Sequence, residues 1–180
     1  MVVKKNIHSR GMTLIEMIVM IVVLSIAIPV LLRMWADVAW RSARSEVMAD
    51  ALVYAEVLLE EIKSKKFDEN VSVPWTQSAN FATADPGENK NNKDTFDDID
   101  DYVGCTDPRV TTPAPGYIRT VTVTYVYPSG SNWLTCAQAC TSETNCSQCA
   151  ACCYKRVKVS VSRSDNTVRD ISLETLMSAY

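Results

Sequence analysis

The chain has 180 residues and a formal net charge of -3, from 21 acidic and 18 basic side chains. This charge lacks the basic excess typical of nucleic-acid binding, so we expect no nucleic-acid partner. The single histidine, His8, precedes the long apolar segment, so the rest of the chain offers no Ser-His-Asp triad and no histidine-ligated zinc. We expect no enzymatic activity and no cofactor, and the length predicts one globular head plus an anchor.

The segment from Met12 to Leu32 is apolar except for Glu16. As a helix it would be about 30 Å long, enough to cross the hydrocarbon core of a membrane. The basic residues within 4–10 predict that the N-terminus stays in the cytoplasm and that the chain beyond the segment is exported. An ordinary secretory signal places its small-residue cleavage site after the apolar run, whereas Gly11 lies before it. A cut after Gly11 would remove the basic leader and keep the hydrophobic helix.

The order of these features resembles the class III signal of type IV pilins and type II secretion pseudopilins: a basic leader, then Gly11, Met12 and Glu16, then a long apolar run. The family usually has Phe where this chain has Met12. The resemblance implies cleavage after Gly11 and N-methylation of Met12. It also implies that Glu16 pairs with the Met12 amine of a neighbouring subunit, an attraction that a medium of low dielectric strengthens.

The same resemblance implies partners and a location. The partners are other pilin or pseudopilin subunits, prepilin peptidase, the inner-membrane assembly platform and, before assembly, membrane lipid. The chain would first be a single-pass protein of the inner membrane, with residues 1–11 as a cleaved cytoplasmic leader and an exported C-terminal head. It would then enter an extracellular or periplasmic filament.

A single long helix is predicted from about Met12 to Lys66. Residues 12–34 form its membrane-spanning or filament-core part, and residues 35–67 form its amphipathic second half. Pro29 lies inside the apolar part and predicts a kink, because proline lacks the backbone N–H. In the second half, apolar residues recur on one helical face, which predicts packing on a sheet. They are Val47, Ala51, Tyr54, Ala55, Leu58 and Ile62.

Residues 68–180 are expected to form the globular head, which begins with a polar, loop-like stretch over 68–116. Five aspartates cluster in this stretch, and after Asp94 the four candidate ligands are Asp97, Asp98, Asp100 and Asp101. Calcium binding is one interpretation, because calcium prefers carboxylate oxygens, but the spacing does not match an EF-hand. A solvated acidic loop is the interpretation that we favour.

Three strands are predicted from the alternation of apolar and polar residues: 118–127, 156–162 and about 168–177. Together with the long helix they predict an α+β, pilin-like fold, in which the N-terminal helix packs against a small antiparallel sheet. The segments "FDDIDDY" (96–102) and "YAEVLLEEI" (54–62) further resemble minor pilin D proteins of the mannose-sensitive haemagglutinin class.

Six cysteines lie in a polar insertion, residues 136–153, between the first two predicted strands, and a seventh lies before it. Metal ligation through CxxC pairs, a redox centre and disulfides are competing interpretations, and we favour disulfides in an oxidising compartment. The candidates are Cys105, Cys136, Cys140, Cys146, Cys149, Cys152 and Cys153. Adjacent Cys152 and Cys153 are expected to bond to different partners. Cys105 is expected either to bridge to the insertion or to remain unpaired.

The leading functional hypothesis is a structural one: a minor pilin or pseudopilin in a type IV-like pilus or a type II secretion filament. A second hypothesis is a surface-exposed adhesin or binding module, with the cysteine-rich insertion as its contact surface. A third is a membrane-anchored, cysteine-rich metal or redox protein. Processing at Gly11 would favour the first two hypotheses, and bound metal would favour the third.

Overall fold

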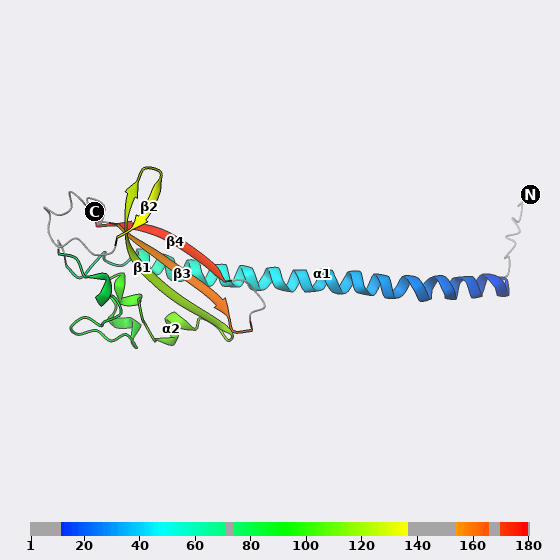
Figure 1. Ribbon diagram of the computed structural model, residues 1–180. Helices are drawn as coiled ribbons and strands as arrows, with labels where there is room; N and C mark the ends of the chain where they lie inside the picture. Colours follow the sequence, from blue (N-terminus) through cyan, green and yellow to red (C-terminus); the bar gives the residue numbers. More distant parts are fainter. Residues whose placement is uncertain (1–11, 71–73, 137–153, 166–169, 180) are drawn as a thin grey trace, which may run out of the picture. The chain divides into compact units, whose positions relative to one another are not determined.

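A computed structural model describes residues 12–70, 74–136, 154–165 and 170–179 (Figure 1). The chain divides into two compact units, Met1–Ala43 and Arg44–Tyr180. One long helix, α1 (Leu14–Lys63), and a small antiparallel sheet give the α+β layout that the sequence predicts. The C-terminal unit contains the sheet and the hydrophobic core.

Helix α1 lies within three residues of its expected bounds at both ends. It begins after Thr13, whose carbonyl oxygen accepts hydrogen bonds from the amides of Glu16 and Met17 at 3.1 and 3.2 Å. The expected kink at Pro29 does not interrupt the helix, which stays α-helical through this residue. Because proline has no N–H, the carbonyl of Ser25 lacks its usual helical donor. The helix therefore tolerates the loss of one hydrogen bond without ending.

The sheet has four strands in the order β2-β1-β3-β4: β1 (Tyr117–Ser129), β2 (Asn132–Thr135), β3 (Tyr154–Arg163) and β4 (Ile171–Ser178). All neighbouring pairs are antiparallel. Strands β1, β3 and β4 correspond to the three predicted strands. Strand β2 was not predicted, and it pairs with the end of β1 through a turn in which Gly130 adopts a φ of 61°. Glycine suits this left-handed conformation because it has no Cβ.

The core of the C-terminal unit lies between the second half of α1 and one face of the sheet. The predicted helical face is buried at Ala51, Ala55, Leu58 and Ile62, joined by Leu59, and it is partly buried at Val47 and Tyr54. Strand β3 contributes Val157, Val159 and Val161, whose alternation places them on one side of the strand. The apolar residues that repeat every 3.6 positions on the helix and every second position on the strand thus pack together in one core.

The segment between α1 and β1, expected as a polar loop, packs onto this core. It contains short 3-10 helices, η1 (Ser78–Asn80), η2 (Lys93–Thr95) and η3 (Asp100–Tyr102), and one turn of helix, α2 (Pro108–Thr111). Its widely spaced apolar residues are buried: Trp75, Phe81, Phe96, Ile99, Tyr102 and Val110. The loop expectation was wrong in this respect, because single apolar residues without a period give no local signal of burial.

Candidate functional site

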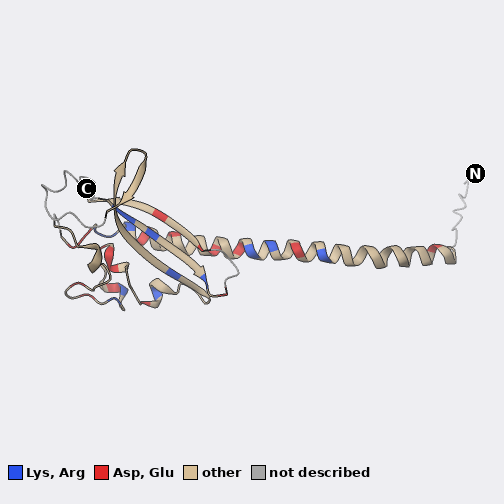
Figure 2. Ribbon diagram, viewed as in Figure 1, with Lys and Arg blue, Asp and Glu red and all other residues tan. Residues whose placement is uncertain are grey.

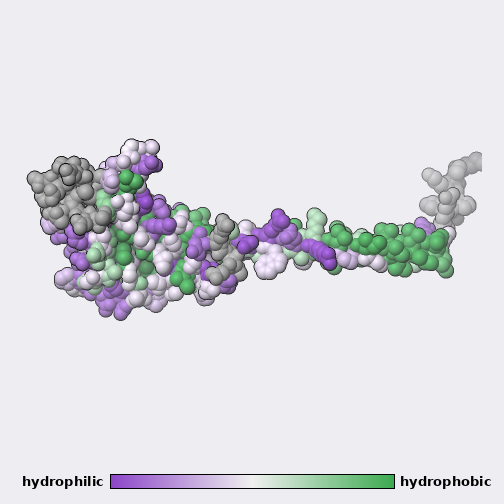
Figure 3. Space-filling view, in the orientation of Figure 1, coloured by the Kyte–Doolittle hydropathy of each residue, from purple (hydrophilic) through white to green (hydrophobic). Residues whose placement is uncertain are grey.

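The apolar half of α1, residues 14–32, has almost entirely exposed side chains among the described residues. Every described side chain from Met12 to Glu46 is exposed, except that of Ala27, which is partly buried. Figure 3 shows the N-terminal part of α1 as a continuous hydrophobic surface, and Figure 2 shows few charged residues there, whereas charged residues are frequent farther along the helix. Within the described chain, α1 is the one helix long and apolar enough to cross a membrane. A surface of this size and kind requires lipid or other protein to cover it.

Glu16 lies in the first turn of this exposed half, with Met12 just before the helix. An acid in the first turn interacts favourably with the helix dipole, so Glu16 also has a local role. In the part of the chain that the structure describes, Glu16 forms no ion pair. Gly11, the predicted cleavage residue, lies outside the described residues. The predicted pairing of Glu16 with a neighbouring subunit therefore stays a prediction.

Two of the seven cysteines lie in the described chain. Cys105 is half-buried, and its Sγ atom accepts a hydrogen bond from the Asp107 amide at 3.3 Å. Burial raises the pKa of the Cys105 thiol, and no disulfide partner for it lies among the described residues. Cys136 is buried after β2, and its amide donates to the carbonyl of Tyr125 at 2.8 Å. Cys140, Cys146, Cys149, Cys152 and Cys153 lie outside the described residues, so their chemistry stays a prediction.

The aspartates expected in a solvated loop are mostly buried, which corrects that expectation. Asp98, Asp100 and Asp101 are at most 2% exposed, and Asp97 is partly buried. The Asp98 Oδ1 atom accepts from the amides of Asp100 and Asp101 at 2.8 and 3.2 Å. The Asp101 Oδ2 atom accepts from the amides of Asp97 and Asp98, both at 3.1 Å. These two carboxylates accept hydrogen bonds from backbone amides of their own loop, in place of backbone carbonyl acceptors, and so stabilise its conformation.

Burial changes the protonation of two acids in this region. Burial, together with the nearby Asp100 and Asp101, raises the pKa of Asp98 to about 8. Burial and the neighbouring Asp101 raise the pKa of Glu88 to about 8 as well. The Asp98 Oδ2 atom has no hydrogen-bond partner among the described residues, and the nearby Lys155 and the Asp101 amide lower the pKa of Asp98 less than burial raises it. Both acids therefore hold a proton at pH values where an exposed carboxyl group has lost it.

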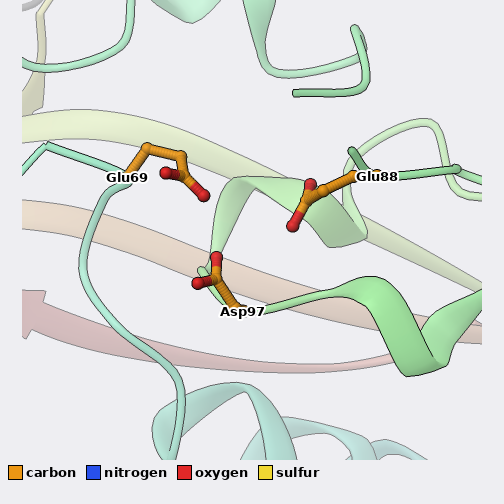
Figure 4. A group of neighbouring side chains, drawn as sticks. All are labelled: Glu69, Glu88 and Asp97. Atoms are coloured by element: carbon orange, nitrogen blue, oxygen red, sulfur yellow. The ribbon is translucent and has the colours of Figure 1, made fainter. Parts of the chain in front are cut away.

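The four calcium candidates do not meet at one point. Figure 4 shows the carboxyl groups of Glu69, Glu88 and Asp97 turned toward one another, with one oxygen of each within 4.8 Å of the others. A second group joins Asp101 to Glu88 and Asp85, whereas Asp98 and Asp100 belong to neither group among the described residues. Lysines already pair with two of these carboxylates: Lys66 with Asp97 at 2.5 Å, and Lys90 with Asp101 at 3.4 Å. We assign no metal ligand here.

A buried cation that the sequence reading did not single out lies at the centre of the head. Lys155 on β3 is fully buried, and its Nζ atom is 2.5 Å from Asp100 Oδ1 and 3.0 Å from Asp68 Oδ2. The third donor position of the ammonium faces the carbonyl of Phe67 at 2.5 Å. Lys155 shares its strand face with Val157, so the alternation of β3 predicts an inward lysine. The acids that meet it come from distant segments, and no local pattern identifies them.

Aromatic rings enclose this charged group. The Lys155 Nζ atom lies 4.7 Å from the ring centre of Phe67, 5.1 Å from that of Phe81 and 5.5 Å from that of Tyr125. The Tyr125 hydroxyl donates to the Thr76 carbonyl at 2.9 Å and lies 3.3 Å from Asp68 Oδ2. Buried charges are costly unless they are paired and hydrogen-bonded, and this group meets both conditions. The arrangement places an amine and two carboxyl groups in contact in a water-excluded site.

No protein-family model matches this chain, and no curated protein or solved structure shows significant similarity to it. Two features of the molecule therefore bear on function. One is the uncovered apolar half of α1 with Glu16 in its first turn. The other is the buried lysine and its two acids.

Proposed function

We propose that this protein is a minor pilin or pseudopilin, a structural subunit of a type IV-like pilus or a type II secretion filament. The observation that carries the proposal is the exposed, apolar half of α1 joined in one chain to a head with its own core. Lipid covers such a surface in a membrane, and the helices of other subunits cover it in a filament. The order of Gly11, Met12 and Glu16 at the start of the apolar run supports assembly into a filament.

Glu16 gives the proposal its physical mechanism. When helices pack into a filament, a carboxylate in the first turn of α1 becomes surrounded by apolar side chains, where an unpaired charge is costly. Cleavage after Gly11 creates an amine at Met12, and the amine of one subunit neutralises Glu16 of the next. The pair adds little in water but much in a medium of low dielectric, so it favours the assembled register over others.

Processing is the first test. Co-expression with a prepilin peptidase is expected to give a mature chain that begins at Met12 and carries an N-methyl group, measured by mass spectrometry of the N-terminal peptide. The Gly11→Val substitution is expected to leave the leader attached, because a branched side chain replaces the small residue at the cut. A chain that keeps residues 1–11 in the presence of active peptidase, or is cut after the apolar run, would contradict the proposal.

Assembly is the second test. Glu16→Leu is expected to leave membrane insertion intact while the amount of protein in sheared filaments falls at least several-fold, measured by immunoblotting of both fractions. Glu56→Leu is the matched control, because Glu56 is an exposed acid on the same helix, outside the apolar half. Equal incorporation of the Glu16→Leu variant and the wild type would show that Glu16 acts only on its own helix.

A further inference from the structure

Lys155 and Asp100 are in direct contact inside the head. Lys155 lies on β3 and Asp100 begins η3, 55 positions earlier in the chain. The side chains are 0% and 2% exposed, and 2.5 Å separates Nζ from Oδ1. The fold thus holds an amine in contact with a carboxyl group. Both side chains are buried away from water, and both are fixed by regular secondary structure. Fixed contact of this kind replaces a bimolecular encounter with an intramolecular one.

We propose that Lys155 and Asp100 condense to form an intramolecular amide bond. A proton first passes from the Lys155 ammonium to the Asp100 carboxylate across their contact. The neutral Lys155 Nζ atom then attacks the Asp100 Cγ atom, a C–N bond forms, and one C–O bond of the carboxyl group breaks. Of the three ammonium protons, one stays on the amide nitrogen and two leave with the departing oxygen as water. No oxidant, reductant or other reactant is consumed, and the ion pair becomes a neutral amide.

Asp68 supplies a second carboxylate that can relay a proton in this reaction. Its Oδ2 atom is 3.0 Å from Lys155 Nζ. The Thr76 amide donates to this oxygen at 3.0 Å, and the Tyr125 hydroxyl lies 3.3 Å from it. The contact with Lys155 places a carboxylate oxygen of Asp68 where it can take a proton from the attacking amine and pass it to the leaving oxygen. Asp100 is the closer acid, and we assign it as the one that forms the bond.

The aromatic surroundings favour the neutral product. The rings of Phe67, Phe81 and Tyr125 lie within 5.5 Å of the Lys155 Nζ atom and replace water around it. In such a site each ion carries a desolvation cost, so joining the two ions into an uncharged amide removes both costs. Exclusion of water also removes the reactant that would hydrolyse the product.

Two other ion pairs in the chain show why contact distance alone is insufficient. Lys66 and Asp97 are also 2.5 Å apart, but their side chains are 63% and 44% exposed. The pair of Lys93 with Glu61 has the same distance, and its side chains are 25% and 27% exposed. Water solvates both pairs as ions, so we expect them to stay unlinked. They are internal controls for the same measurement.

The experiment is mass spectrometry of the full-length protein, extracted in detergent, reduced, alkylated and digested with trypsin. A bond between Lys155 and Asp100 is expected to join fragment 94–109 to fragment 120–156, because trypsin no longer cuts at the modified lysine. The joined mass is expected to be lower than the sum of the fragments by one water molecule, and tandem fragmentation locates the bond. A link to fragment 67–90 would overturn the assignment of Asp100. Without the bond trypsin also cuts after Lys155, so complete recovery of the unlinked fragments 94–109 and 120–155 at full mass would overturn the proposal.

Variants separate the roles of the three residues. Lys155→Arg keeps the positive charge but removes the amine, so the linked product is expected to be absent. Asp68→Ala keeps both bond-forming groups, and the linked fraction is expected to fall several-fold if Asp68 relays the proton. Lys66→Arg is the control, and its linked fraction is expected to equal that of the wild type. A fully linked Asp68→Ala protein would overturn the relay role. If a variant fails to fold, the wild-type fragments decide the proposal by themselves.

Discussion

At the scale of single residues, Asp98 is the acid whose charge the fold disfavours most clearly. It is fully buried, its Oδ2 atom has no partner among the described residues, and its pKa is raised to about 8. The unfolded chain loses this proton near pH 4, about the ordinary value for aspartate. Between about pH 4 and about pH 8 the folded protein therefore binds more protons than the unfolded chain, and the free energy of unfolding falls as pH rises.

The Asp98→Asn variant tests this account. An asparagine Oδ1 atom can still accept from the amides of Asp100 and Asp101, while the side chain no longer ionises. We expect the fall in stability between about pH 4 and about pH 8 to become shallower, and the variant to be at least about 1 kcal/mol more stable than the wild type at pH 8. Urea unfolding at several pH values measures both effects.

Asp94→Asn is the control for this prediction. The side chain of Asp94 is 73% exposed and lies in the same segment, so we expect its replacement to leave the slope with pH unchanged. A wild-type stability that is constant or rises between about pH 4 and about pH 8, with Asp98→Asn parallel to it, would contradict the prediction.

The buried site around Lys155 also shows which features of single residues can be predicted from the sequence. The acidic run at 97–101 has the composition of a solvated loop, but lysines from other segments pair with two of its buried acids, Lys155 with Asp100 and Lys90 with Asp101. The alternation of β3 predicts that Lys155 points inward with Val157. Nothing local predicts that Asp68 and Asp100 meet it, since such contacts depend on tertiary structure.

At the scale of elements, the two halves of α1 differ in burial. The first half is exposed among the described residues, and one face of the second half packs in the core. The second half buries Ile62 completely in the core, while Val57 on the same half is 60% exposed. We expect Ile62→Ala to lower the free energy of unfolding by about 2–5 kcal/mol, because it leaves a cavity in a packed core. Val57→Ala is the matched control and is expected to change it by less than about 0.5 kcal/mol. Urea unfolding of the full-length protein in detergent, followed by near-UV circular dichroism, measures the difference; equal losses would place the helix face elsewhere.

Elements with a strong period were predictable, and short ones were not. The helix and strands β1, β3 and β4 each repeat their apolar residues over at least two turns or several alternations. Strand β2 has four residues, all exposed, so it has no buried face from which a period could be read. Hydrogen bonding to the end of β1, and not its own pattern, makes it a strand.

At the scale of the whole molecule, the chain joins a unit with a core to one without. The described residues of Met1–Ala43 bury almost nothing, whereas Arg44–Tyr180 contains the hydrophobic core. The N-terminal unit therefore depends on its surroundings for burial, and the C-terminal unit depends on its own contacts. This division suits the filament role that we propose, because lipid and then other subunits would cover the apolar half while the head keeps its own core.

The register of the sheet has a further consequence for the cysteine-rich insertion. Val126 on β1 pairs with Thr135 on one side and with Tyr154 on the other. The insertion thus leaves the sheet and returns to it at points about two strand spacings apart, or about 10 Å. A linker of four residues can span that distance. The intervening length is therefore not fixed by the sheet.

Replacement of residues 137–153 by a short Gly-Ser linker is accordingly expected to preserve the sheet and the burial of Trp75, measured by circular dichroism and tryptophan fluorescence. Loss of the folded signal would show that the insertion is part of the core. If the sheet persists, the sequence and length of the insertion can vary without any change in the sheet. Sequence drift there could then change the outer chemistry of the protein without any change in the fold that carries it.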